Sequence, residues 1–581
     1  MTDHGLSALV VPSADPHQSE YVAEHWQARQ WISGFTGSAG TAVVTRDRAG
    51  LWTDFRYWIQ AEAQLKDSGF ELFRQGEPDT PAVDAWLAKT LEEGDTIALA
   101  GDLFSRSQVK GYLKTWEGTG LKVETGLDPV AELWENRPAM PASPAYDFEV
   151  SLAGEGREDK LARIRKKMVK SRADYYLITR LEEIAWALNL RGADVDCTPV
   201  NIAFALIGLE AVSLFMDKAK LDEGLEAALA RAGVACLEYG AVIPALEALP
   251  AHGAVLLDPA SVNVRLWDAL PESCKKIEVK VGPVEALKAR KNAVEVNHLT
   301  DTLVRDGAAM VSFLHWLETQ VASGKRITEV QAGDQVKEFR AAQDGFVDNS
   351  FNPIMAQGAH SAMCHYSADA ASDARISTQG LFLTDSGGQY LTGTTDITRT
   401  LCFGEPTRAQ KRDYTLVMKG HIAVATARFP AGTRGCQLDT LARQALWQAG
   451  MDFGHGTGHG VGFFLSVHEG PARISPFPVD VAMEPGMVIT NEPGLYREGE
   501  YGIRLENMVL VKEDLETVFG KFNRFDTLTL CHFERALLDT ALMTPAEIQW
   551  VNDYHARVFE SLSPLVEDSL VEWLRAKTQP L

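Results

Sequence analysis

Residues 381–400 read LFLTDSGGQYLTGTTDITRT, and this stretch decides the fold of the part of the chain that carries chemistry. The apolar run that ends in Asp385 and the β-branched run around Asp396 are typical of strands, and the glycines between them are typical of a turn. A hairpin that turns near Tyr390 places the two carboxylates roughly opposite each other on one face. Two facing carboxylates destabilise a fold unless a proton or a cation lies between them. The apolar residues before Asp385 count against a merely solvated hairpin, so the stretch predicts a cation site.

Two histidines lie downstream in a glycine-rich run, GHGTGHGVG at residues 454–462. Glycines permit close backbone approach and unusual dihedral angles. A single histidine is more often a structural group than a ligand, but His455 and His459 share this run, and His468 follows in VHEGP at 467–471. The three histidines are therefore candidates for the same site as the carboxylates.

Two further carboxylates occur in apolar runs. Residues 487–494 read MVITNEPG, a strand that ends at Glu492, for which a solvated strand end is the alternative. Residues 502–510 read GIRLENMVL, a strand with Glu506 embedded among apolar neighbours. A buried glutamate is rarely unpaired. Arg504 is either its partner or, being two residues away on the same face, a second group that lines the site.

The four carboxylates and one histidine form an oxygen-rich, sulfur-free set of candidate ligands. Such hard ligands suit manganese or magnesium better than a structural zinc ion. Four carboxylates carry four negative charges, which two divalent cations neutralise, so a dinuclear centre is more sensible than a single ion. Paired metal ions polarise a carbonyl and activate water, which is an arrangement of hydrolases.

The composition limits the class of protein. The chain has 581 residues, too many for one hydrophobic core, and its net charge of −23 argues against nucleic acid or an anionic membrane as a partner. The first residues show no signal peptide, and no apolar run reaches the roughly 18 residues of a membrane span. Seven scattered cysteines without a C-x-x-C pair indicate reduced thiols and a cytoplasmic protein.

Domain boundaries are expected at a proline-rich linker and at a change in pattern. Residues 137–144 read RPAMPASP, and the pattern becomes strongly helical near Val284. We expect domains at 1–137, 145–285 and 286–581. The first two read as α/β, either as distant copies of one unit or as unrelated domains. The glycine-rich run at 34–40 lacks a phosphate-binding pattern and is interpreted as a tight turn between strands.

The order of these motifs resembles that of the pita-bread metallopeptidase family, which includes methionine aminopeptidase, prolidase and aminopeptidase P. The matching pieces are TDSGGQY at 384–390, GTTDITRT at 393–400, GTGHG at 456–460, NEPG at 491–494 and RLEN at 504–507. The resemblance implies five metal ligands, with Asp396 and Glu506 bridging two metal ions: Asp385, Asp396, His459, Glu492 and Glu506. The ions are expected to be manganese, with zinc or cobalt as alternatives.

The resemblance also implies roles for residues around the metals. His365, His455 and His468 match histidines that contact substrate or carry protons. For the mechanism we expect Glu492 to carry the proton between the attacking hydroxide and the leaving nitrogen. Arg504 and Tyr496 match positions near the substrate.

Within the family the chain looks most like the three-domain cytosolic type of aminopeptidase P. This implies two creatinase-like α/β domains followed by a pita-bread catalytic domain with a C-terminal extension, and a homodimer. The middle-domain stretch 181–192 reads as a short amphipathic helix closed by a glycine, and His532 stands where this subgroup is expected to have proline.

The implied activity is release of the first residue from peptides with proline second, since proline fixes φ and removes a backbone donor. The alternatives are a prolidase that cleaves only dipeptides, a metal-free binding protein, and a metal-free hydrolase of small amidines.

Overall fold

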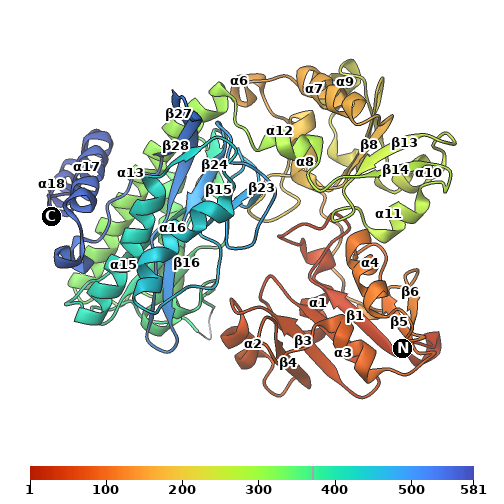
Figure 1. Ribbon diagram of the computed structural model, residues 1–581, viewed down its shortest axis with the longest axis horizontal. Coiled ribbons are helices and arrows are strands. Elements are labelled where there is room, and N and C mark those ends of the chain that lie inside the picture. The colour runs from red at the N-terminus through yellow and green to blue at the C-terminus, as the bar shows by residue number, and fades with distance from the viewer. Residues whose placement is uncertain (370–371) are drawn as a thin grey trace. The chain divides into compact units, whose positions relative to one another are not determined.

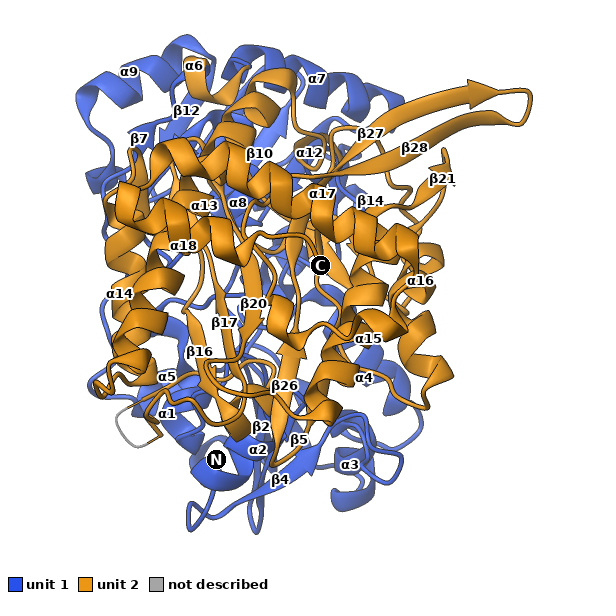
Figure 2. Cartoon of the chain, turned by 90° about the vertical axis from the view of Figure 1, so that its left-hand side faces the viewer, with its two compact units in different colours: residues 1–150, 155–285 blue, residues 151–154, 286–581 orange. Residues whose placement is uncertain are grey.

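The computed structural model describes residues 1–369 and 372–581 (Figure 1). The chain forms two compact units, coloured separately in Figure 2. Unit 1 comprises Met1–Val150 and Glu155–Glu285, and unit 2 comprises Ser151–Gly154 and Ala286–Leu581. Among the described residues, no helix combines the length and the hydropathy that crossing a membrane demands.

The first half of unit 1 is built on a six-stranded sheet with the order β4-β3-β2-β1-β5-β6. Its central strand β1 is buried along its whole length, as expected of an apolar run in a covered sheet. The strands are β1 (Ala8–Pro12), β2 (Thr41–Thr45), β3 (Ala49–Thr53), β4 (Phe70–Arg74), β5 (Thr96–Leu99) and β6 (Lys122–Glu124). The helices are α1 (Ala28–Ser33), α2 (Trp58–Gln64), α3 (Val83–Thr90), α4 (Arg106–Thr115) and α5 (Pro129–Leu133).

The second half of unit 1 repeats this sheet, with the order β12-β11-β10-β8-β13-β14. In both sheets the successive pairings, taken in the order given, are parallel, antiparallel, antiparallel, parallel and parallel. The strands are β8 (Tyr175–Ile178), β10 (Phe204–Gly208), β11 (Val212–Phe215), β12 (Val234–Leu237), β13 (Ala254–Leu257) and β14 (Lys275–Glu278). The helices are α7 (Arg157–Lys170), α8 (Leu181–Leu188), α9 (Glu223–Arg231), α10 (Val242–Glu247) and α11 (Val264–Ala269). This common topology favours the interpretation as two copies of one unit.

Two local expectations differ in detail. The turn at 34–40 joins helix α1 to β2 rather than two strands, and the buried Arg29 holds it by donating hydrogen bonds to the carbonyls of Phe35 and Gly37. Helix α8 ends not at a glycine but at Asn189, which adopts the left-handed conformation with φ 48°. Asparagine tolerates this conformation better than most residues, so it can close a helix.

Unit 2 has helices on the outside of its strands, and in Figure 2 they lie in front of them. Helix α13 begins after a capping box, which the side chains of Asn292 and Glu295 form at its start. The helices are α12 (Pro283–Lys288), which starts at the end of unit 1, α13 (Ala293–Ala322), α14 (Glu329–Ala341), α15 (Arg408–Ala425), α16 (Gly435–Gln448), α17 (Pro545–Leu562) and α18 (Asp568–Lys577).

The strands of unit 2 form two three-stranded sheets, a pair and a larger sheet of order β21-β28-β27-β24-β22-β23. The smaller sheets contain β15 (Phe346–Asn349), β16 (Ile354–Gln357), β17 (Phe382–Ser386), β18 (Gly388–Tyr390), β19 (Gly393–Thr394) and β20 (Ile397–Leu401), and the pair is β25 (Gly494–Arg497) with β26 (Tyr501–Arg504). The larger sheet contains β21 (Arg428–Pro430), β22 (Gly458–Gly460), β23 (Glu469–Ile474), β24 (Val488–Asn491), β27 (Asn507–Thr517) and β28 (Gly520–Thr527). One hydrophobic core runs through this unit from α13 to α18.

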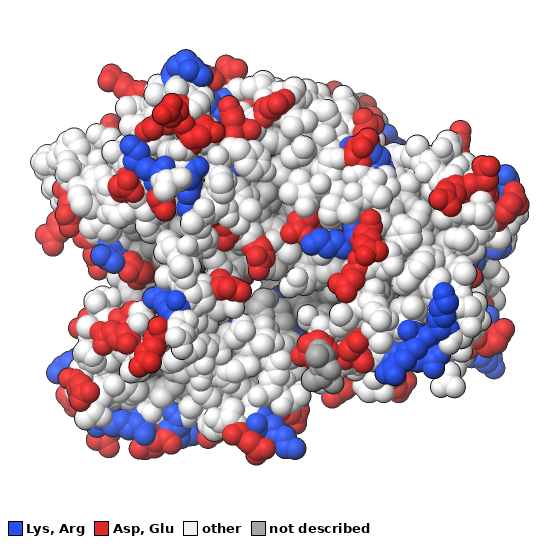
Figure 3. Space-filling model, turned by 180° about the vertical axis from the view of Figure 1, so that it is seen from behind, with Lys and Arg blue, Asp and Glu red and all other residues white. Residues whose placement is uncertain are grey.

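On the face drawn in Figure 3, acidic side chains are scattered in small groups with basic ones between them. Mixed charges of this kind, with a net charge of −23, favour solubility.

Candidate metal centre

The quoted stretch 381–400 supplies two carboxylates, but in a register different from the predicted one. Asp385 in β17 pairs with Thr398 of β20, and Asp396 lies just before β20. The hairpin itself is confirmed, because β18 and β19 continue the register of β17 and β20 up to the pair Tyr390–Gly393, but Asp385 faces Thr398, two residues beyond Asp396. Asp385 and Asp396 nevertheless come from neighbouring strands and are both buried.

The other two carboxylates lie where strands end. Glu492 directly follows β24, and Glu506 lies in a break between β26 and β27 rather than inside the predicted continuous strand. The break arises because the Glu506 amide donates to the carbonyl of Thr398, 3.2 Å away, in a different sheet. The Thr398 hydroxyl also donates to Glu506 Oε2 over 2.7 Å.

One histidine completes the cluster. Asp396, His459 and Glu506 each offer a ligand atom, and these atoms lie within 4.8 Å of one another. His459 Nε2 lies 3.5 Å from Asp396 Oδ2 and 3.6 Å from Glu492 Oε1. Its other nitrogen, Nδ1, lies 2.9 Å from the carbonyl of Gly460, which leaves Nε2 facing the carboxylates as a ligand requires.

Close backbone packing explains the glycine track. A Cβ atom on Gly458 would lie 1.9 Å from the carbonyl oxygen of Thr490, and one on Gly460 would lie 2.3 Å from that of Glu469. Only glycine fits at these two positions, so β22 can carry His459 close to its neighbouring strands.

The electrostatics of the cluster fit a cation. Burial, together with the neighbouring carboxylates, raises the pKa of Glu506 well above its ordinary value, and burial also raises the pKa of Glu492. Burial alone would lower the pKa of His459, but hydrogen bonding with Asp396 and the charge of Glu492 raise it to about 9. Such a concentration of negative charge is what bound cations neutralise.

Asp385 is held by an arginine. Burial raises its pKa, and the guanidinium of Arg504, 2.5 Å from Oδ2, opposes this. The second oxygen, Oδ1, is buried and has no hydrogen-bond partner within the described part of the chain. A buried carboxylate oxygen without a donor is a ready ligand. We conclude that the donor set fits hard divalent metal ions.

A chain of hydrogen bonds leads from Asp385 to a further histidine. Arg504 donates from Nη1 to the Tyr496 hydroxyl over 2.7 Å, and this hydroxyl lies 2.8 Å from His455 Nε2. Arg504 therefore contacts Asp385 rather than Glu506, which was the alternative partner in the sequence. The three predicted residues Arg504, Tyr496 and His455 are brought together.

The remaining candidate histidines flank the cluster. The ring of His468 lies 4.3 Å from that of His459, centroid to centroid, in an edge-to-face arrangement. His365 is partly exposed after the short helix η5 (Gly358–Ala362). Helix η5 is bound to β26, since the Gly502 amide donates to Ser361 Oγ over 2.7 Å, and β26 ends at Arg504.

Sequence reasoning missed residues that hold the ligands in place. Arg443 donates to the carbonyl of His455 over 2.6 Å, and Asp439 accepts from the hydroxyl of Thr457 over 2.7 Å. Arg443 and Asp439 also pair with each other in α16, four residues apart, and this spacing is the one signal that could have revealed them.

A second missed group stands behind the histidines. Lys288 and Lys291 both bind the carboxylate of Glu469, and all three side chains are buried. Glu469 follows His468 and pairs across the sheet with Gly460, which follows His459. The group therefore fixes the point at which the segments of the two histidines meet.

Family models match nearly the whole chain. Metallopeptidase family M24 matches residues 298–513, the creatinase/prolidase N-terminal domain matches 1–127 and again 136–295, and the C-terminal region of peptidase M24 matches 521–581. Aminopeptidase P2 of Arabidopsis thaliana is 38% identical over 99% of this chain and 86% of its own length. A probable Xaa-Pro aminopeptidase P of Laccaria bicolor is 39% identical over 100% of this chain and 92% of its own length.

Solved structures agree with this placement. The X-prolyl aminopeptidase of Caenorhabditis elegans, described as a cytosolic enzyme with a dinuclear active site, matches with TM-score 0.95 and 34% identity over 99% of this chain and 95% of its own. The Xaa-Pro dipeptidase of Bacillus anthracis matches with TM-score 0.51 and 25% identity over 65% of this chain and 99% of its own. The predicted fold, two creatinase-like α/β domains before a pita-bread domain, is confirmed. The chain therefore belongs to metallopeptidase family M24, in the group that contains the aminopeptidases P.

Proposed function

We propose that this chain is a dinuclear metalloaminopeptidase that releases the first residue from peptides with proline in second position. The observation that supports the proposal is that Asp396, His459 and Glu506 offer ligand atoms within 4.8 Å of one another, with Glu492 3.6 Å from His459, in a chain that matches Xaa-Pro aminopeptidases over its full length. The length also favours an aminopeptidase over a dipeptidase, since the similar dipeptidase covers only 65% of this chain.

The proposed metal ligands are Asp385, Asp396, His459, Glu492 and Glu506, and the proposed ions are two Mn²⁺. A bound pair of such ions supplies Lewis-acid polarisation of the substrate carbonyl and activation of water.

Proton transfer is assigned to Glu492. Its side chain is 18% exposed and that of Asp396 5%, so Glu492 is the more accessible to substrate and water. A carboxylate in this position can take a proton from the attacking water and deliver it to the leaving nitrogen. His365, His455 and His468 are proposed to position the substrate and to exchange protons with it.

Arg504 and Tyr496 are proposed to act near the substrate by holding Asp385 and His455. The contacts of Arg504 with Asp385 and Tyr496 support this, because they fix a ligand and a histidine relative to each other. The domain boundaries 1–137, 145–285 and 286–581 are retained as a proposal.

A cytoplasmic homodimer is proposed as the working form. The cytosolic description of the enzyme from Caenorhabditis elegans supports the location. Exposed aromatic side chains of unit 2, Phe477 at 68% and Phe519 at 88%, are surfaces that a second copy could cover. Sedimentation velocity of the full chain tests the dimer, which a single monomer species at micromolar concentration would contradict.

Peptide hydrolysis tests the proposed activity. With Mn²⁺ we expect release of arginine from Arg-Pro-Pro, no cleavage of Arg-Ala-Ala, and loss of activity after chelation, because the metal pair is required. Released amino acid is measured by chromatography. Cleavage of the dipeptide Ala-Pro alone would reassign the chain as a prolidase, and no cleavage of any peptide would favour a binding protein.

The hydroxyl of Thr398 provides a finer test of the ligand assignment. We expect Thr398→Val to weaken Mn²⁺ binding about tenfold, because Glu506 loses the donor that orients it. Thr400→Val is the matched control, since Thr400 is equally buried on the same strand but donates to the carbonyl of Arg504. Titration calorimetry of the metal-free chain measures both, and equal affinities for the two variants would contradict the assignment.

A further inference from the structure

The conspicuous motif residue that the metal centre leaves unexplained is Arg399. It follows Thr398 in β20, is fully buried, and points into the main hydrophobic core rather than toward the carboxylates. The ring of Phe533 packs on its guanidinium, 4.2 Å from centroid to Cζ. Burial of a guanidinium costs free energy unless its N–H groups all donate hydrogen bonds. The acceptors of Arg399 therefore indicate its role.

One side of the guanidinium holds the main chain of Glu506. Nη1 donates to the Glu506 carbonyl over 2.6 Å, and Nη2 donates to the side-chain oxygen of Asn507 over 2.8 Å. Thr398 binds the Glu506 amide and carboxylate, as described above. Two successive residues of β20 therefore fix the amide, the carbonyl and the carboxylate of Glu506.

The other side of the guanidinium is held by the C-terminal extension, residues 528–581. Nε donates to the carbonyl of His532 over 3.0 Å, and Nη2 donates to the carbonyl of Cys531 over 2.7 Å. Nη2 also donates to the Tyr554 hydroxyl, 3.1 Å away on helix α17. All three partners belong to a segment that no candidate ligand comes from.

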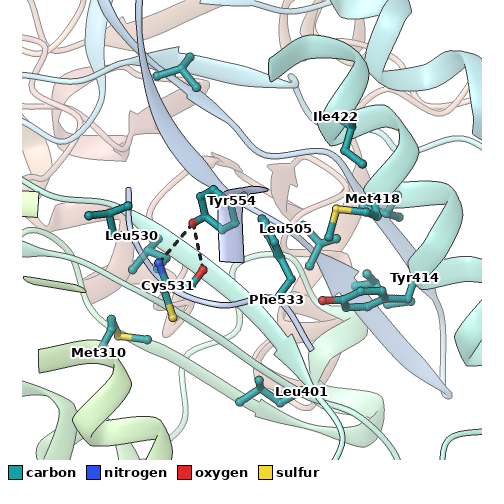
Figure 4. Packing of buried hydrophobic residues seen from close by; sticks show 14 of the residues in the cluster. Met310, Leu401, Tyr414, Met418, Ile422, Leu505, Leu530, Cys531, Phe533 and Tyr554 are labelled. Atoms are coloured by element: carbon teal, nitrogen blue, oxygen red, sulfur yellow. Dashed lines mark hydrogen bonds between the residues drawn. The ribbon is translucent and has the colours of Figure 1, made fainter. Parts of the chain in front are cut away.

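Tyr554 also fixes the loop that supplies those carbonyls. Figure 4 shows its hydroxyl between the amide and the carbonyl of Cys531. The hydroxyl lies 3.2 Å from that amide and 2.9 Å from that carbonyl, and 3.0 Å from the carbonyl of Thr529. The tyrosine therefore sets the loop and the guanidinium together.

We infer that the C-terminal extension is a positioning element for the metal centre, acting through Tyr554 and Arg399 on the main chain of Glu506. The inference rests on the proposed role of Glu506 as a metal ligand. Fixed geometry of a ligand raises metal affinity because less has to be ordered when the ion binds. Neither Tyr554 nor Arg399 needs to touch metal or substrate for this.

Removal of one hydroxyl tests the inference on the full chain. We expect Tyr554→Phe to weaken Mn²⁺ binding about tenfold in titration calorimetry of the metal-free protein. Tyr414→Phe is the matched control, because Tyr414 is buried in the same core and its hydroxyl also binds the extension, at the Glu534 amide over 3.0 Å. It should leave the affinity within about twofold of the parent.

Two more variants make the result unambiguous. Arg399→Lys keeps the charge but loses the planar fork, so it should weaken Mn²⁺ binding at least as much as Tyr554→Phe. Glu506→Gln tests the ligand assignment itself. If Glu506→Gln weakens binding while Tyr554→Phe and Arg399→Lys bind as the parent does, the positioning role is overturned alone. Equal losses in Tyr554→Phe and Tyr414→Phe would overturn it too, and unchanged binding in Glu506→Gln would overturn the ligand assignment with it.

Discussion

Replacing Glu506 by glutamine is expected to lower kcat/KM for Arg-Pro-Pro by about 10³-fold or more and, at the same time, to stabilise the metal-free chain. The activity falls because one of the carboxylates that would hold the proposed metal ions is lost. Above the raised folded pKa of Glu506 the stability rises because the cluster holds one buried charge fewer, which relieves about 1–3 kcal/mol of unfavourable desolvation. A substitution that lowers activity but raises the stability of the metal-free chain indicates a metal ligand, whereas loss of a structural residue lowers both.

The pH dependence of the metal-free chain follows from the same groups. Burial first, and neighbouring carboxylates second, raise the folded pKa of Glu506, and burial raises that of Glu492. The stability that such a group contributes is complete below its unfolded pKa of about 4 and is lost as pH rises through the folded pKa. His459, with a folded pKa raised to about 9, contributes stability that is complete below its unfolded pKa of about 6.5 and lost through 9. We therefore expect stability to fall from pH 5 to pH 9.

Chemical denaturation of the metal-free chain at pH 5, 7 and 9 measures both effects. Glu506→Gln should show a smaller fall with pH than the parent, and Mn²⁺ should restore the parent but not the variant. Glu484→Gln is the control, because Glu484 is 48% exposed in its pair with Arg290. A variant that is less stable than the parent without metal at pH 7 would contradict the prediction.

Replacing Glu469 by glutamine is expected to destabilise the catalytic unit by about 3–5 kcal/mol, because two buried ammonium groups lose their shared counter-ion. The side chains of Lys288 and Lys291 are 7% and 1% exposed, so water cannot take the place of the carboxylate. Hydrogen exchange of the amides in β22–β24 is the measurement of choice, since it reports opening of this unit rather than of the whole chain.

The control for Glu469 lies close by in sequence and differs in burial. Glu484→Gln breaks the exposed pair with Arg290, and we expect an effect below about 1 kcal/mol. The double variant Glu469→Gln with Lys291→Met removes one of the stranded charges and should recover part of the loss. Equal protection in the parent and in Glu469→Gln would show that the buried triad does not stabilise the unit.

The candidate ligands could be read from sequence because each stands at an abrupt change in local pattern. Asp385 and Glu492 end apolar runs, and His459 interrupts a glycine track. Their register was missed by two residues, because the hairpin turns between residues 391 and 392 and a small shift of the turn moves every facing pair. The break at Glu506 could not be predicted, since the partner of its amide is the carbonyl of Thr398 in another sheet.

The residues that support the candidate ligands could not be predicted from the local sequence pattern. Lys288 and Lys291 lie at and just beyond the end of α12, and their partner Glu469 lies 181 and 178 residues away. Arg399 sits inside a recognised motif, yet its partners Cys531 and Tyr554 follow 132 and 155 residues later. A single sequence does not show which residues come into contact at such separations, because these contacts arise only when the core has formed.

The unexpected His532 gains a meaning from the way in which Arg399 is bound. The guanidinium donates hydrogen bonds to the main-chain carbonyls of Cys531 and His532. Every amino acid, proline included, has such a carbonyl. A proline at position 532 would therefore still accept the hydrogen bond of Arg399, whereas a one-residue insertion that shifted the two carbonyls would remove it.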